Sequence, residues 1–166
     1  GAIATDSASR AWIVGAVTSE SGQDGYAARW NGSRWTSTTV PQSHEFSGPA
    51  GVTMSGRDAW AVGEKLVNTT TSRIDPQILR WNGRKWSAQH TPNPAGQPSD
   101  GQSGLTAVSA SATKFAVAVG DYFVDGGGCG PAVGEAAVYR DGSWREAKLP
   151  APKSGPANHT RPACGG

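Results

Sequence analysis

Residues 80–86 read Arg-Trp-Asn-Gly-Arg-Lys-Trp, and this stretch decides the fold. An Asn-Gly pair flanked by aromatic and β-branched residues is the strongest short-range signal for a β-hairpin. The same pattern stands at residues 29–35, and a shorter form with Asp-Gly at its turn stands at residues 139–144. The chain is therefore expected to contain three hairpins of one kind.

Each hairpin lies inside a longer repeat unit. An apolar element that ends in Val-Gly precedes every hairpin, at residues 12–15, 60–63 and 117–120, and a proline follows every hairpin. Another apolar stretch begins each unit, at 2–4, 51–54 and 105–108. Each unit thus divides into four short strands. Four antiparallel strands that recur at a period of about 50 residues are the pattern of a β-propeller blade.

The composition agrees with strands and turns. The 166 residues include seven Trp, 23 Gly and 11 Pro. The formal net charge is +2 and only 17% of the residues are charged, which argues against a protein that binds phosphate backbones. No apolar run approaches the roughly 18 residues of a membrane-spanning helix. The length suits one domain over 1–166. We expect its repeat units at about 1–50, 51–104 and 105–150, with a linker or closing tail at 151–166.

The motifs resemble the tandem β-propeller repeats of secreted bacterial proteins, which are common in actinobacteria. Trp-Ala-Val-Gly at residues 60–63 and Arg-Trp-Asn-Gly-x-x-Trp at residues 80–86 carry the resemblance, which covers nearly the whole chain. It implies an all-β fold of three four-stranded antiparallel blades and a secreted, extracellular protein. The third unit departs from the pattern, because Val117 and Tyr139 stand where the other units have Trp.

The repeated tryptophans are interpreted as packing residues between blades, because they stand at matching positions. The alternative is a ring of sugar-stacking tryptophans. Propellers usually have four to eight blades, so three blades would leave two apolar faces open. We expect a second copy of the chain to close a six-bladed ring as a homodimer. Further blades of a longer chain are the alternative.

The candidate ligand-binding residues are Glu64, Asp121, Tyr122 and Phe123. Glu64 and Asp121 follow the Val-Gly element at equivalent positions, and the two aromatic residues come next in the third unit. A carboxylate can bind a sugar hydroxyl, and an aromatic ring can stack on a sugar face. In the alternative interpretation the carboxylates cap turns or pair with nearby cations, and the aromatic rings only hold the insertion in place.

All of these candidates fall in long connections that a four-stranded meander would gather on one face. Binding residues concentrate on such loops. The predicted long connections are residues 16–25, 64–76 and 121–134 within the units, and 42–50, 93–104 and 151–166 after them.

Cys129 and Cys164 are the only two cysteines. In an oxidising compartment they are expected to form a disulfide that ties the tail to the insertion, and free or intermolecular thiols are the alternative. The three histidines are not spaced as metal ligands, and no catalytic or phosphate-binding motif is present. The sequence therefore assigns no metal, no cofactor and no catalytic residue, and it predicts neither a nucleic-acid nor a membrane partner.

The leading functional hypothesis is a secreted, lectin-like module that binds carbohydrate through the long-loop face. An enzyme is the second hypothesis, namely a glycoside hydrolase or polysaccharide lyase that uses Glu64 and Asp121 as acid and base at the channel mouth. A protein-interaction scaffold without a small ligand is the third. Fold alone does not choose among these classes.

Overall fold

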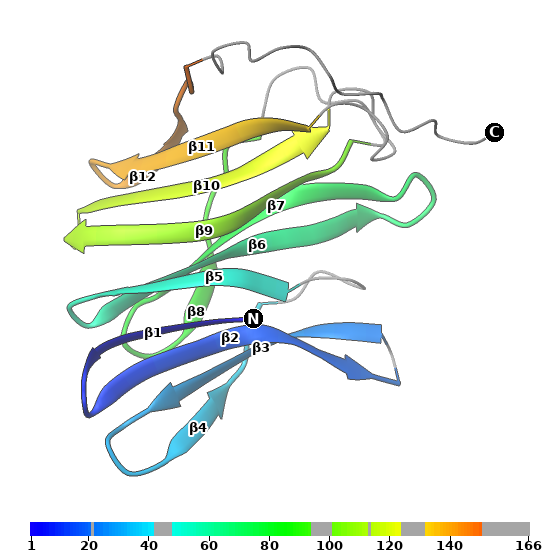
Figure 1. Cartoon of the computed structure of the whole chain (residues 1–166). Coiled ribbons are helices and arrows are strands. Elements are labelled where there is room, and N and C mark those ends of the chain that lie inside the picture. Colours follow the sequence, from blue (N-terminus) through cyan, green and yellow to red (C-terminus); the bar gives the residue numbers. More distant parts are fainter. Residues whose placement is uncertain (21, 42–47, 94–100, 113, 124–131, 151–166) are drawn as a thin grey trace, which may run out of the picture.

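A computed structural model describes residues 1–20, 22–41, 48–93, 101–112, 114–123 and 132–150. In this part of the chain twelve strands form three separate four-stranded antiparallel sheets, and no helix is long and apolar enough to cross a membrane (Figure 1). Within each sheet, strands that are consecutive in the sequence pair with each other. The predicted all-β class with three four-stranded units is confirmed.

The three sheets follow one another along the chain. Sheet 1 contains β1 (Ala2–Ser7), β2 (Arg10–Ser19), β3 (Gly22–Trp30) and β4 (Trp35–Thr38). Sheet 2 contains β5 (Gly48–Ser55), β6 (Asp58–Asn68), β7 (Arg73–Trp81) and β8 (Trp86–Ala88). Sheet 3 contains β9 (Ser103–Ala112), β10 (Phe115–Phe123), β11 (Ala132–Arg140) and β12 (Ser143–Glu146).

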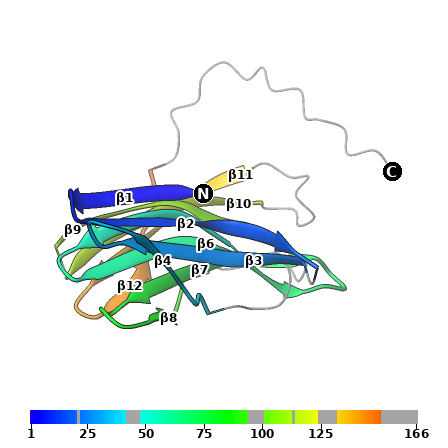
Figure 2. The same ribbon diagram turned by 90° about the horizontal axis from the view of Figure 1, so that it is seen from below.

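The sheets stack face to face with their first strands together. β5 contacts both β1 and β9, and a Cβ added at Gly51 of β5 would lie 2.9 Å from the carbonyl oxygen of Thr106 in β9. The fourth strands lie on the far side of the stack, as Figure 2 shows for β8 and β12 opposite β1. This order, with first strands inside and fourth strands outside, is that of adjacent propeller blades.

The turns between third and fourth strands explain the Asn-Gly motif. The side-chain oxygen of Asn82 accepts hydrogen bonds of 3.0 Å from the backbone N–H groups of Arg84 and Lys85, and Asn31 does the same in sheet 1. Gly83 has a φ of 93°, a conformation that glycine adopts without steric cost. The predicted hairpins are therefore confirmed, and residues within each turn supply the hydrogen bonds and the backbone conformation that the turn needs.

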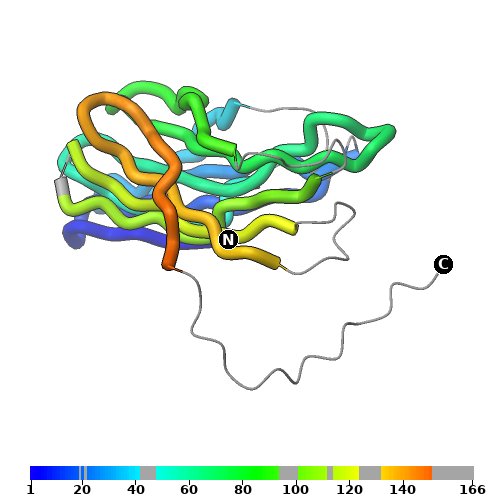
Figure 3. The backbone as a smooth tube through the Cα atoms, turned by 90° about the horizontal axis from the view of Figure 1, so that it is seen from above, coloured from blue at the N-terminus to red at the C-terminus, as the bar shows by residue number. Residues whose placement is uncertain are grey.

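The predicted long loops at 16–25 and 64–76 are wrong, and so are both described ends of the one at 121–134, because residues 121–123 of β10 pair with residues 132–134 of β11. In sheet 1, β2 and β3 stay paired as far as Ser19 opposite Gly22, and in sheet 2, β6 and β7 stay paired as far as Asn68 opposite Arg73. The hairpin of β6 and β7 projects at one end of the stack (Figure 3). Strands that extend beyond the core face water on both sides, so their residues lose the apolar alternation that reveals a strand.

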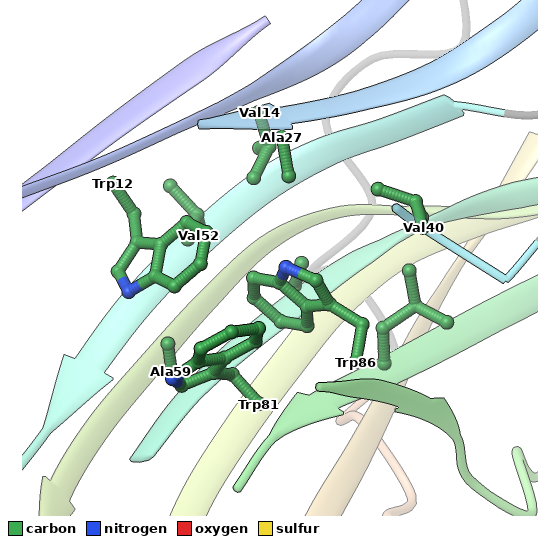
Figure 4. Packing of buried hydrophobic residues seen from close by; sticks show 10 residues of the cluster. Trp12, Val14, Ala27, Val40, Val52, Ala59, Trp81 and Trp86 are labelled. Atoms are coloured by element: carbon green, nitrogen blue, oxygen red, sulfur yellow. The ribbon is translucent and has the colours of Figure 1, made fainter. Parts of the chain in front are cut away.

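Two apolar cores lie between the sheets. The core between sheets 1 and 2 gathers around Trp12, which lies 4.9 Å from both Trp81 and Trp86 between ring centroids (Figure 4). The core between sheets 2 and 3 gathers around Trp60, which is fully buried. The interpretation of the tryptophans as packing residues is confirmed for those within the two cores.

Candidate functional site

The Val-Gly element positions the two candidate carboxylates. A Cβ at Gly120 would overlap the carbonyl oxygen of Gly104 and would lie 2.7 Å from the Cα of Leu105. β9 comes this close because its pairing with β10 is bulged between Val119 and Gly120. Gly63 of β6 meets the same kind of bulge in β5. Glycine at these positions lets the first strand approach, and the next residue of each β6 or β10 strand is a carboxylate.

These carboxylates line one cavity between sheets 2 and 3. The cavity has a volume of about 330 Å³, and β5, β6, β9 and β10 contribute most of its wall. Glu64 comes from sheet 2, whereas Asp121 and Phe123 come from sheet 3. The structure thus brings together three of the four predicted site residues. The other lining residues are Gly48, Ala50, Gly63, Ile74, Gln102, Ser103, Gly104, Leu105 and Thr106.

Tyr122 is placed elsewhere. Successive side chains of a strand point to opposite faces, so Tyr122 diverges from its neighbours Asp121 and Phe123. It lines a second cavity of about 460 Å³ on sheet 3, together with Glu135, Glu146 and other residues of β11 and the segment after β12. The binding role predicted for Tyr122 would therefore concern a different cavity.

Burial and mutual repulsion act on Glu64. The residue as a whole stays exposed, but partial burial of its carboxyl group raises the pKa of that group, and the negative charge of Asp121 raises it further. The side chain of Glu64 packs against Gly104 of sheet 3. A Cβ added at Gly104 would lie only 2.8 Å from Glu64 Oε2. Glu64 thus lies at the interface of sheets 2 and 3. A change of its charge affects both the packing of these sheets and the charge of the cavity wall.

Sequence reasoning missed Glu135 of β11. Its side chain is 7% exposed, Ser103 Oγ donates a 2.9 Å hydrogen bond to Oε2, and Oε1 has no partner among the described residues. Burial raises its pKa to about 7 against the lowering effect of Ser103, and the charges of Asp121 and Glu146 add to the rise. The repeat offered one signal for this residue, because Glu135 and Gln77 occupy equivalent positions in their units. Glu135 lies opposite Gly120, Gln77 lies opposite Gly63, and both side chains are buried.

The raised pKa of Glu135 predicts a pH-dependent stability. Between pH 4.5 and about 7 the folded chain retains a proton that the unfolded chain has released. The free energy of unfolding is therefore highest below this window and falls as the pH rises through it, by up to about 3 kcal/mol. Glu64 acts in the same direction because its pKa is also raised.

Urea unfolding at several pH values measures this effect. The variant Glu135→Gln is expected to lose most of the decrease between acidic and neutral pH. Glu20→Gln, at an exposed position, serves as the matched control and is expected to keep the wild-type profile. Equal pH profiles of Glu135→Gln and the wild type would show that Glu135 titrates normally.

Comparison with known proteins concerns the fold. The sequence matches no model of a known protein family and no curated protein. A solved structure described as YCF48 bound to D1 peptide matches 87% of this chain, with a TM-score of 0.52 and 14% sequence identity. That structure is a β-propeller. The fold of this chain is a β-propeller fold.

The three sheets are therefore propeller blades. The chain spans 38% of the length of the YCF48 chain that it matches, and at 14% identity the similarity concerns the fold alone. The cavity between sheets 2 and 3 lies between two successive blades, beside their first strands. The predicted disulfide between Cys129 and Cys164 lies outside the described residues.

Proposed function

We propose that this propeller is a secreted carbohydrate-binding module and that the cavity between sheets 2 and 3 holds the sugar. One observation carries the proposal. The cavity combines two carboxylates, Glu64 and Asp121, with the aromatic ring of Phe123. A sugar matches this combination, because it presents hydroxyl donors on its edge and an apolar face of C–H groups.

Each wall of the cavity suits one part of a sugar. Carboxylate oxygens accept hydrogen bonds from neighbouring hydroxyl groups, and charge-assisted bonds of this kind are the stronger ones. Ser103, Thr106 and Gln102 line the cavity as well. A volume of about 330 Å³ lies at the small end of ligand pockets, which span roughly 300–1,000 Å³. It favours a terminal or short saccharide unit over a long buried chain.

Binding to a glycan array, followed by calorimetry on the best glycan, tests the proposal. Loss of one charge-assisted hydrogen bond costs about 1.5–3 kcal/mol, so Glu64→Gln is expected to weaken binding by about tenfold or more. Phe123→Ala is expected to weaken it similarly through the loss of stacking. Glu20→Gln is the control, because it removes one negative charge at an exposed position and leaves the cavity unchanged. It is expected to bind as the wild type does.

Two outcomes would contradict this assignment. One is the absence of binding to any glycan by a folded wild-type chain. The other is binding that Tyr122→Ala abolishes and Phe123→Ala leaves unchanged. That result would move the ligand to the neighbouring cavity on sheet 3, which Tyr122 lines.

A hydrolase is the second candidate, and the electrostatics of Glu64 favour it. A carboxyl group with a raised pKa beside a second carboxylate is the arrangement that supplies a general acid and its ionised partner in glycosidases. Incubation of the chain with the glycans that it binds would reveal this activity. Product release that Glu64→Gln and Asp121→Asn both abolish would favour the enzyme, whereas binding without product would favour the module.

A further inference from the structure

An aromatic pair recurs at the turn between the third and fourth strands of every sheet. The ring centroids are 5.8 Å apart for Trp81 and Trp86 in sheet 2, and 5.5 Å apart for Tyr139 and Trp144 in sheet 3. In sheet 1 the ring centroids of the equivalent pair, Trp30 and Trp35, are 5.6 Å apart. All three pairs therefore have nearly the same geometry.

Two of these pairs hold an inserted tryptophan from the preceding sheet. Trp12 of sheet 1 contacts both rings of the pair in sheet 2. Trp60 of sheet 2 contacts both rings of the pair in sheet 3, at 4.6 Å and 5.2 Å between centroids. Both inserted rings stand first in the Val-Gly element of their sheet. This three-ring contact is the repeated connection between neighbouring blades.

The pair in sheet 1 holds no third ring from the described residues. Trp35 is 44% exposed, whereas its counterparts Trp86 and Trp144 are 4% and 5% exposed. Trp30 is nevertheless fixed, because its indole N–H donates a 3.1 Å hydrogen bond to the carbonyl oxygen of Ala8. The pair is thus preorganised for a partner that the described residues do not supply.

This face of sheet 1 carries further apolar side chains. Trp12 and Val14 point into the core with sheet 2, so Ile13 and Val17 point to the opposite face by the alternation of a strand. Val17 and Ile3 are both exposed, at 45% and 67%. The exposed face therefore continues the packing surface that sheets 2 and 3 use against their preceding neighbours.

We propose that this face is the docking site of a further propeller blade that carries a tryptophan at the position of Trp12 and Trp60. The indole of that blade inserts between Trp30 and Trp35 and completes a third three-ring contact. This contact has the geometry of the two blade interfaces already present in the molecule. The inserted tryptophan is therefore the feature that identifies the docking blade.

The third sheet of a second copy presents a different side chain. At the position of Trp12 and Trp60, sheet 3 carries Val117. A valine does not span the distance that an indole fills, so it would leave a gap next to Trp30 and Trp35. A homodimeric ring would therefore lack the contact that connects the blades inside the chain.

Supplying the missing ring on sheet 3 tests the proposal. The variant Val117→Trp gives the chain an inserted tryptophan at its other end. Light scattering at micromolar concentration is expected to show a monomeric wild type and association of Val117→Trp. Val119→Trp is the matched control, because Val119 lies on the same face of β10, two residues from the inserting position. It is expected to remain monomeric.

The double variant Val117→Trp with Trp35→Ala shows whether the association uses the aromatic pair. It is expected to be monomeric, and near-ultraviolet circular dichroism confirms that each variant is folded. Two results would overturn the proposal. Either folded Val117→Trp stays monomeric, or the wild type already associates and loses this association with Trp35→Ala. In the second case the occupant is a second copy of the chain.

Discussion

Replacing Trp60 with alanine is expected to lower the free energy of unfolding by about 3–5 kcal/mol. The side chain is fully buried between sheets 2 and 3, and it contacts both Tyr139 and Trp144. The guanidinium of Arg80 also lies 5.2 Å from the centroid of its ring. The substitution removes all of these contacts and leaves a cavity that the rigid strands cannot close. Urea unfolding followed by circular dichroism measures the loss.

Trp35→Ala is the control for this prediction, because it removes the same residue type from a position that is 44% exposed. Its expected cost is below about 1 kcal/mol. Equal losses for Trp60→Ala and Trp35→Ala would contradict the packing described for the two sheets.

Replacing Gly120 with alanine is expected to lower the free energy of unfolding by about 3 kcal/mol or more, which is the upper end for an overpacked site. The added methyl group would overlap the carbonyl oxygen of Gly104 and crowd the Cα of Leu105. Both obstacles are backbone atoms of the neighbouring strand, so no side-chain rotation relieves them. Thermal and urea unfolding both report the effect.

Gly134→Ala tests the same substitution at a neighbouring place in sheet 3. A Cβ there meets only the Cδ1 of Leu149, at 3.1 Å, and that atom is the end of a movable side chain. Its expected cost is below about 1 kcal/mol. A larger loss for Gly134→Ala than for Gly120→Ala would show that the close approach of β9 and β10 is misplaced.

The local signals of the sequence were sufficient for the hairpins. Asn82 and Gly83 satisfy the turn by themselves, one through its side-chain oxygen and the other through its positive φ. The repeat of these signals then predicted three sheets of four strands, because each unit carries the same set. The apolar cores followed as well, since Trp12 and Trp60 stand at matching positions.

Features that depend on distant parts of the chain were not predictable in this way. The hairpin of β6 and β7 extends past the core, where the ladder continues without an apolar pattern. The buried Glu135 accepts its hydrogen bond from Ser103 of β9, which is 32 residues away in the sequence. The separation of Tyr122 from Phe123 follows from strand pleating, which the prediction of a loop at 121–134 had left out.

The contacts of the inserted tryptophans test the account most directly. Nuclear Overhauser effects between indole protons of the labelled chain report which rings are neighbours. Cross-peaks are expected from Trp12 to Trp81 and Trp86, and from Trp60 to Trp144. Cross-peaks that instead connect Trp12 with Trp30 or Trp35, within its own sheet, would contradict the stacking of the three sheets as propeller blades.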